Sequence, residues 1–252
     1  MNNSSPTGSS LRFLGVRLDN LTRTEALARL TAFAASGTPH HVVTVNPEFV
    51  VQAQDCPEFA RVLNDADLAL ADGAGLALAA RLLGSRLAAR IPGADLVDAL
   101  AAMAAVANHS MFLLGAAPGV AADAAAALQQ RHRGLIIAGA FAGSPAAGEA
   151  NAIVTMVAAA KPHFLFVAYG SPQQDLWIRR NLDRLGVPVC MGVGGAFDYL
   201  SGRVPRAPRW MRSAGLEWAY RLAREPWRWR RMVRLPRFLV LVALQRLRRQ
   251  GG

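Results

Sequence analysis

The sequence predicts an α/β fold: a Rossmann-like, mostly parallel sheet with helices on both faces, followed by a C-terminal helical appendage. Short apolar runs alternate with amphipathic segments from residue 11 to residue 202, the pattern of repeated strand–helix units. The runs are apolar throughout, as expected for strands buried on both faces of a parallel sheet. Beyond Gly202 the strand signal stops and four prolines punctuate short helical segments, which marks the appendage.

The elements follow in chain order from this pattern. The apolar runs predict strands at Leu11–Val16, His41–Val45, Leu68–Ala71, Met111–Leu114, Leu135–Ala138, Phe164–Ala168 and Val187–Gly192. The first helix is predicted to begin at Thr22, because Thr22 and Glu25 match a capping box. Helical patterns occur at Thr22–Ala35, Pro47–Asn64, Gly75–Leu83, Ala94–Val106, Val120–Gln130, Ala146–Ala159 and Gln173–Leu185.

Three regions are predicted. Residues 1–10 are rich in Ser, Asn and Gly and lack the pattern of a signal peptide, so they are expected to be disordered. Residues 11–202 form the α/β core, and residues 203–252 the basic helical appendage. Cys56 and Cys190 form no CxxC motif and predict no disulfide scaffold.

The positive charge of the chain is concentrated in the appendage. Residues 203–252 contain 14 Arg, two Glu and four of the five Trp, whereas residues 1–202 are nearly neutral. Arg, Trp and the short apolar run Phe238–Leu244 together predict a helix lying on an anionic membrane surface. No stretch has the roughly 18 apolar residues that cross a bilayer. We therefore expect a cytoplasmic protein, peripheral on the inner face of the cell membrane, with lipid contacts from Trp227, Trp229, Arg234, Arg237, Phe238 and Leu241.

Ligands of an open parallel sheet bind outside the carboxyl ends of its strands. Four of the five turns predicted there contain glycine, and each turn leads into a helix N-terminus. Glycine lets backbone N–H groups approach an anion closely, so the turns predict a phosphate-bearing ligand. They are Asn46-Pro47, Asp72-Gly73-Ala74-Gly75, Gly115 with Gly119, Gly170-Ser171-Pro172 and Gly192-Val193-Gly194-Gly195.

Asp72 is the candidate catalytic residue. It ends a buried strand on the ligand side of the sheet, where partial burial would raise its pKa and suit it to act as a general base. The structural alternative is an N-cap for the helix near Gly75. Thr44 and Asn46, after the neighbouring strand, present a hydroxyl and an amide to the same region, and Asn46 is equally suited to cap the helix that starts at Pro47.

The sequence indicates neither a metal site nor a bound cofactor. Asp65-Ala66-Asp67 resembles a metal-binding D-x-D but precedes its strand, so it lies at the edge of the sheet opposite Asp72. The five histidines show no metal-ligand spacing. A GxGxxG fingerprint is absent after the first strands, which argues against a nicotinamide enzyme.

Arginine is suited to neutralise a diphosphate leaving group without a metal. Arg90 is the candidate in the core. In the appendage, four arginines recur at spacings of three and four, so that one helical face presents several of them: Arg221, Arg224, Arg228 and Arg231. The alternative for each is contact with lipid phosphates.

An ordered set of motifs runs through the chain from about Val42 to Arg231: Thr44-x-Asn46, Asp72-Gly73-x-Gly75, Arg90-x-x-Gly93, Phe112-Leu113-Leu114-Gly115, Gly170-x-Pro172-x-Gln174-Asp175, Gly192-x-Gly194-Gly195-x-Phe197-Asp198, Gly202-x-x-x-Arg206-Ala207-Pro208, Gly215-Leu216-Glu217-Trp218-x-x-Arg221 and Glu225-Pro226-x-Arg228-x-x-Arg231. This set resembles the WecG/TagA/CpsF glycosyltransferases. The family motif usually reads Pro-Lys-Gln-Glu where this chain has Pro172-Gln173-Gln174-Asp175.

The resemblance implies transfer of a sugar from a UDP-sugar to a polyprenyl-diphosphate-linked saccharide, by a single inverting displacement without a metal. Asp72 would be the general base. Donors of the ManNAc, ManNAcA and glucose types occur in the family, whose products are teichoic-acid linkage units and other surface polysaccharides. The substrate-binding residues would be Thr44, Asn46, Arg90, Gly115, Gly170, Gln174, Gly194, Arg221, Arg228 and Arg231.

Two other functions remain open at this point. The basic, Trp-bearing appendage is also typical of a nucleic-acid-binding protein, although the run Phe238–Leu244 and the ordered motifs of the core weigh against nucleic acid as a partner. A membrane-bound scaffold is disfavoured by the intact Asp72. The sequence leaves open the donor sugar, the acceptor saccharide and whether chains assemble into a homo-oligomer.

Overall fold

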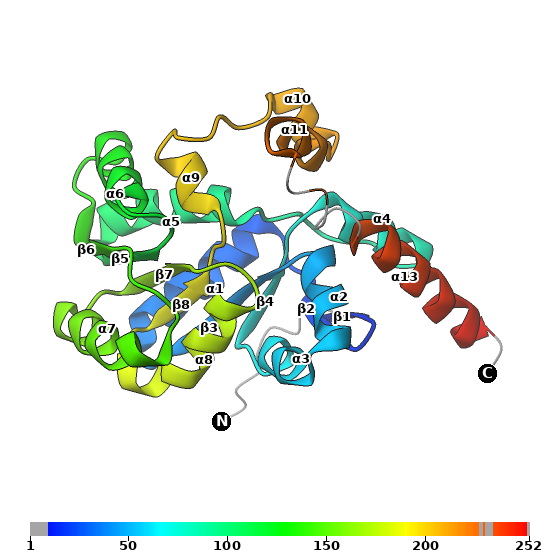
Figure 1. The fold of residues 1–252 in the computed structure, drawn as a ribbon, viewed down its shortest axis with the longest axis horizontal. Coiled ribbons are helices and arrows are strands. Elements are labelled where there is room, and N and C mark those ends of the chain that lie inside the picture. The colour runs from blue at the N-terminus through cyan, green and yellow to red at the C-terminus, as the bar shows by residue number, and fades with distance from the viewer. Residues whose placement is uncertain (1–9, 227–228, 230–233, 251–252) are drawn as a thin grey trace.

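The computed structural model describes residues 10–226, 229 and 234–250. Within these residues a six-stranded sheet has the strand order β4-β3-β8-β7-β5-β6, and every neighbouring pair is parallel (Figure 1). The strands are β3 (His40–Val45), β4 (Leu68–Ala71), β5 (Ser110–Gly115), β6 (Ile136–Phe141), β7 (Phe164–Ala168) and β8 (Val189–Gly192). The α/β class and the parallel sheet are confirmed.

Helices cover both faces of the sheet because neighbouring strand residues point to opposite sides. Val42 packs in one apolar cluster and Val43 in another. The first cluster takes side chains from α1 (Arg23–Ser36), α5 (Gly93–Ala107), α6 (Val120–Arg131) and α9 (Ala196–Leu200). The other face is covered by α2 (Pro47–Asp55), α3 (Pro57–Asn64) and α4 (Ala74–Leu82). On that same face, α7 (Ala147–Ala160) and α8 (Gln173–Leu185) pack against β5 and β7.

The described part of the chain begins with a hairpin where a single strand was predicted. β1 (Ser10–Phe13) pairs antiparallel with β2 (Val16–Asp19). The run Leu11–Val16 is interrupted because Leu14 and Gly15 have φ values of 50° and 86°, the left-handed conformation of a two-residue hairpin turn. Ser10 therefore belongs to a strand, and the rest of the predicted disordered terminus lies outside the described residues.

The predicted helix Pro47–Asn64 is two helices. Cys56 is extended, with φ −135° and ψ 96°, and separates α2 from α3. The cause is Pro57, which disfavours a helical conformation at the preceding residue. The capping box at the start of α1 is confirmed, since Thr22 and Glu25 bond reciprocally.

The appendage forms α10 (Arg209–Ser213), α11 (Glu217–Arg224) and α13 (Arg234–Gln250). α13 packs along α2 and α4 (Figure 1). Phe238 and Val242 are fully buried there, in the same apolar cluster as the hairpin. The prediction of a lipid contact for Phe238 is therefore wrong, because the face of α13 that carries Phe238 packs against the core. The division at residue 202 remains a prediction.

The outward side of α13 carries a second apolar stripe. Val240, Leu244 and Leu247 are 60%, 46% and 63% exposed, at the i, i+4 and i+7 spacing of one helix face. Of the helices in the described part of the chain, none combines the length and apolar character needed to cross a bilayer.

Candidate active site

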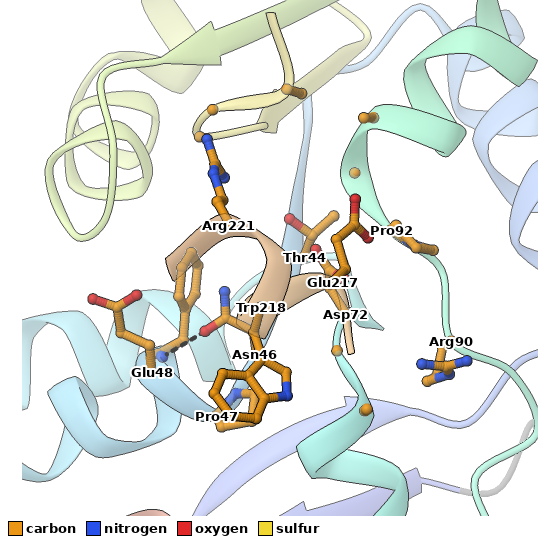
Figure 2. A pocket seen from close by; sticks show the side chains of 18 of the residues that line it. Thr44, Asn46, Pro47, Glu48, Asp72, Arg90, Pro92, Glu217, Trp218 and Arg221 are labelled. Carbon is orange, nitrogen blue, oxygen red and sulfur yellow. Dashed lines mark hydrogen bonds between the residues drawn. The ribbon is translucent and has the colours of Figure 1, made fainter. Parts of the chain in front are cut away.

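A cavity of about 670 Å³ opens at the carboxyl ends of β3, β4 and β8, as expected for an open parallel sheet (Figure 2). Its floor comes from the turns after these strands, and its cover from α11 and the first residues of α13. The appendage thus completes a pocket that the core alone would leave open.

Most of the predicted site residues come together in this cavity. Those that line it are Thr44, Asn46, Asp72, Arg90, Gly170, Gln174, Gly194 and Arg221. Gly115 is not among the lining residues. It has a φ of 103°, and a Cβ atom there would lie 2.8 Å from the backbone of Ala168, so glycine is required where β5 approaches the end of β7. Arg228, Arg231 and Trp227 lie outside the described residues.

Asp72 stands at the floor of the pocket. Its backbone N–H donates to the carbonyl of Val45 at 2.7 Å, which holds the turn against the end of β3. The N-cap of α4 is Gly73, without a side-chain capping bond, so Asp72 does not serve as the cap. Burial raises the pKa of Asp72 to about 7, although a hydrogen bond from the backbone of Gly93 opposes the shift.

Two further carboxylates and an arginine surround Asp72. Arg206, near the start of the appendage, forms hydrogen bonds with Asp95 on α5 and with Glu217 on α11. Figure 2 shows Glu217 beside Asp72 and Thr44. The charges of Glu217 and Asp95 raise the pKa of Asp72 further, and that of Arg206 lowers it. The appendage therefore contributes directly to the electrostatics of the candidate base.

Arg221 reaches the opposite side of the pocket. Its guanidinium lies 4.7 Å from the centre of the Tyr199 ring and 3.1 Å from a carboxylate oxygen of Glu225. A Cβ atom on Gly195 would lie 2.8 Å from the same guanidinium, so Arg221 packs directly on the glycine turn after β8. This places a planar cation next to exposed backbone, an arrangement suited to an anionic ligand.

Thr44 and Asn46 have structural roles as well as positions in the pocket. Asn46 caps α2, where its side-chain oxygen accepts from the N–H of Phe49 at 3.0 Å, so the capping alternative is confirmed. The hydroxyl of Thr44 donates to the carbonyl of Gly192 at 3.3 Å and ties β3 to the end of β8. Trp218, 42% exposed, lies near Asn46 and Pro47 in Figure 2.

Several pocket residues were not predicted. Those with polar or aromatic side chains include Glu48, Phe49, Asp95, Ser171, Tyr199, Arg206, Arg212, Glu217 and Trp218. Arg206, Glu217 and Trp218 belong to motifs of the family resemblance, so their sequence context held a signal. No comparable sequence signal marks Glu48 or Asp95, because acidic residues are common in the first turn of a helix on any protein surface.

The residues expected on the membrane have other contacts. Arg234 lines the pocket and forms a salt bridge with Glu48. Arg237 forms two hydrogen bonds with the carboxylate of Asp55, at 2.7 and 2.8 Å. Leu241 is half-buried, and Trp229 is 56% exposed. In the structure, Arg234 and Arg237 therefore attach α13 to α2.

Across the described residues, no group of three or more His, Cys, Asp and Glu side chains is arranged to hold a metal ion. Three carboxylates of the pocket instead pair with arginines: Asp95 and Glu217 with Arg206, and Glu48 with Arg234.

Comparison with known proteins identifies the family of the chain. The sequence profile of the WecG/TagA/CpsF glycosyl transferase family matches residues 11–252. An N-acetylglucosaminyldiphosphoundecaprenol N-acetyl-β-D-mannosaminyltransferase of Bacillus spizizenii is 36% identical over 201 residues, 80% of this chain and 77% of the relative. A protein of the same name from Staphylococcus aureus (strain MW2) is 34% identical over 235 residues, 91% of each chain. The chain therefore belongs to the WecG/TagA/CpsF glycosyltransferase family.

Proposed function

We propose that this glycosyltransferase moves a sugar from a UDP-sugar to a polyprenyl-diphosphate-linked saccharide by inversion, with Asp72 as the general base. The observation that carries the proposal is Asp72 itself, a carboxyl group at the floor of the pocket with a pKa of about 7. Such a group is ionised in part near neutral pH and is basic enough to take a proton from a hydroxyl group in the transition state.

The names of the relatives favour N-acetylmannosamine as the sugar and N-acetylglucosaminyl diphosphoundecaprenol as the acceptor. Those names specify a β linkage. Formation of a β linkage from an α-linked nucleotide sugar inverts the anomeric carbon, as one direct displacement does.

In this reaction the acceptor hydroxyl loses its proton to Asp72 while its oxygen forms a bond to the anomeric carbon. The bond from that carbon to the diphosphate oxygen breaks, and UDP leaves with the electron pair. Arg221 would balance the charge on the leaving group, a role supported by the position of its guanidinium on the Gly195 backbone within the pocket. By the family resemblance, Arg228 and Arg231 would add to this charge.

The lipid-linked acceptor requires the protein to work at a membrane surface. We assign that contact to the outward stripe Val240, Leu244 and Leu247 of α13, flanked by the exposed Arg246. This replaces the buried Phe238 as the apolar contact. Because Arg234 and Leu235 of the same helix line the pocket, binding at the stripe would hold the pocket near the lipid.

The test is UDP release from a panel of UDP-ManNAc, UDP-ManNAcA and UDP-glucose, on vesicles that carry N-acetylglucosaminyl diphosphopolyprenol, with EDTA present. We expect release with one donor, and a loss of roughly 10²–10⁴-fold in Asp72→Asn, the usual contribution of a general base. Asp65→Asn is the matched control, because Asp65 is exposed and precedes β4 at the opposite edge of the sheet. Full activity of Asp72→Asn would refute the base, and activity only without EDTA would refute metal independence.

A further inference from the structure

A buried group of polar side chains lies directly behind the pocket wall. Gln174 and Asp175, in the first turn of α8, are 1% and 0% exposed, and His41 at the start of β3 is 0% exposed. Consecutive polar residues are seldom both buried at a helix start, because they point about 100° apart. Here Gln174 reaches the pocket lining and Asp175 lies behind it.

The amide of Gln174 is held at both ends. Its nitrogen donates to an Asp175 carboxylate oxygen at 3.4 Å, and its oxygen accepts from the backbone N–H of Gly194 at 2.9 Å. An ionised carboxylate can only accept hydrogen bonds, so Asp175 determines which end of the amide faces it. The amide oxygen is then directed to Gly194, which lines the pocket.

His41 supports the carboxylate from the other side. Its ring nitrogen Nε2 lies 3.5 Å from the second oxygen of Asp175, and both side chains are fully buried. A buried carboxylate is costly unless charge or hydrogen bonds compensate it. In the described part of the chain, His41 is the basic side chain that lies beside this carboxylate, at a distance too long for a good hydrogen bond.

The group is pressed against the end of β8. A Cβ atom on Gly192 would lie 2.5 Å from Asp175 Oδ1 and 2.5 Å from Gln174 Nε2, so only glycine fits there. The carbonyl of the same Gly192 accepts from the hydroxyl of Thr44, another pocket residue. Asp175 therefore influences the pocket through its contacts with Gln174 and with the Gly192–Gly195 turn.

We propose that Asp175, supported by His41, is a positioning residue that sets the orientation of the Gln174 amide and thereby the conformation of the Gly194 turn in the pocket. Asp175 touches no substrate in this role. An asparagine at position 175 would weaken this control, because its own amide can donate as well as accept, and only the N–H of Gly194 would then distinguish the two ends of the Gln174 amide.

The first test needs no turnover. Val193-Gly194 is the one Val-Gly pair in the sequence, so labelling Val with ¹³C at the carbonyl and Gly with ¹⁵N gives a single NMR signal from Gly194. We expect Asp175→Asn to move this signal toward its position in Gln174→Ala. Asp183→Asn, exposed on the same helix, is the control and should leave it in place. An unmoved signal in folded Asp175→Asn would overturn the proposal. If that variant does not fold, His41→Asn serves the same test, with a smaller shift in the same direction expected.

The second test rests on the proposed function and measures UDP release. Asp175→Asn should lower kcat/KM by about tenfold, the effect of one misplaced hydrogen bond, and should have little further effect in the Gln174→Ala background. The melting temperature should not fall in parallel, since Asn keeps the shape of the buried Asp175 side chain and most of its contacts. Additive losses, or losses that follow the melting temperature, would overturn the positioning role. An inactive wild type would instead refute the proposed function and leave the NMR test to decide this one.

Discussion

The ring of Phe238, in the last helix, packs against the ring of Phe13 in the first strand, with their centres 6.5 Å apart. This contact joins the two ends of the described chain on one side of the sheet. It also positions α13 so that Arg234 and Leu235 form part of the pocket wall. An appendage that the sequence marks as separate by its charge is thus part of the core by its packing.

Loss of the Phe238 ring should release α13 from the core. Phe238→Ala removes a fully buried side chain, and such changes cost about 3–5 kcal/mol in other proteins. We expect the free energy of opening of residues 234–250, measured by amide hydrogen exchange, to fall by an amount of this order. Val240→Ala is the matched control on the exposed face of the same helix. Equal protection in the two variants would show that the ring does not hold the helix.

The parallel sheet, the capping box and most pocket residues could be predicted because they depend on local patterns and on the carboxyl-edge rule. The burial of Phe238 could not be predicted from the sequence. Its segment has apolar residues on two faces of one helix, and the sequence does not distinguish the face that packs on α2 from the face that meets solvent. Glu48 was missed because an acidic residue in the first turn of a helix carries no signal of its own, and its partner Arg234 lies far away in the chain.

Asp72 should make the fold less stable as the pH rises. The pKa of the folded state is raised from 3.8 to about 7, so the folded protein binds the proton more tightly than the unfolded chain. The stabilising effect is complete below pH 3.8 and is lost as the pH rises through about 7. We therefore expect Asp72→Asn to melt several degrees above the wild type at pH 8, and the difference to vanish toward pH 4. A difference independent of pH would contradict the raised pKa.

The pair Arg206 and Glu217 should tune the pH dependence of activity in opposite directions. Activity is expected to rise with pH through about 7 as Asp72 ionises. Glu217→Gln removes a negative charge that raises the pKa of Asp72, so the rising limb should move to lower pH. Arg206→Gln removes a positive charge that lowers this pKa, so the limb should move to higher pH. The measurement is kcat/KM for UDP release between pH 5 and pH 9, and shifts in the same direction would refute this electrostatic role.

The outward stripe of α13 should control binding to membranes without affecting the pocket. Replacement of Val240, Leu244 and Leu247 by Ser removes exposed apolar area, so the variant should float less with anionic vesicles. Binding of the wild type to these vesicles should also weaken as salt screens its arginines.

The matched control replaces Val106, Ile136 and Met156 by Ser, because these residues are also exposed but lie far from α13 in the chain. Turnover on a water-soluble acceptor should remain, because the stripe residues face away from the buried Phe238 and Val242. Equal flotation of the two triple variants would place the membrane contact elsewhere, and a loss of soluble turnover would show that the stripe also supports the pocket.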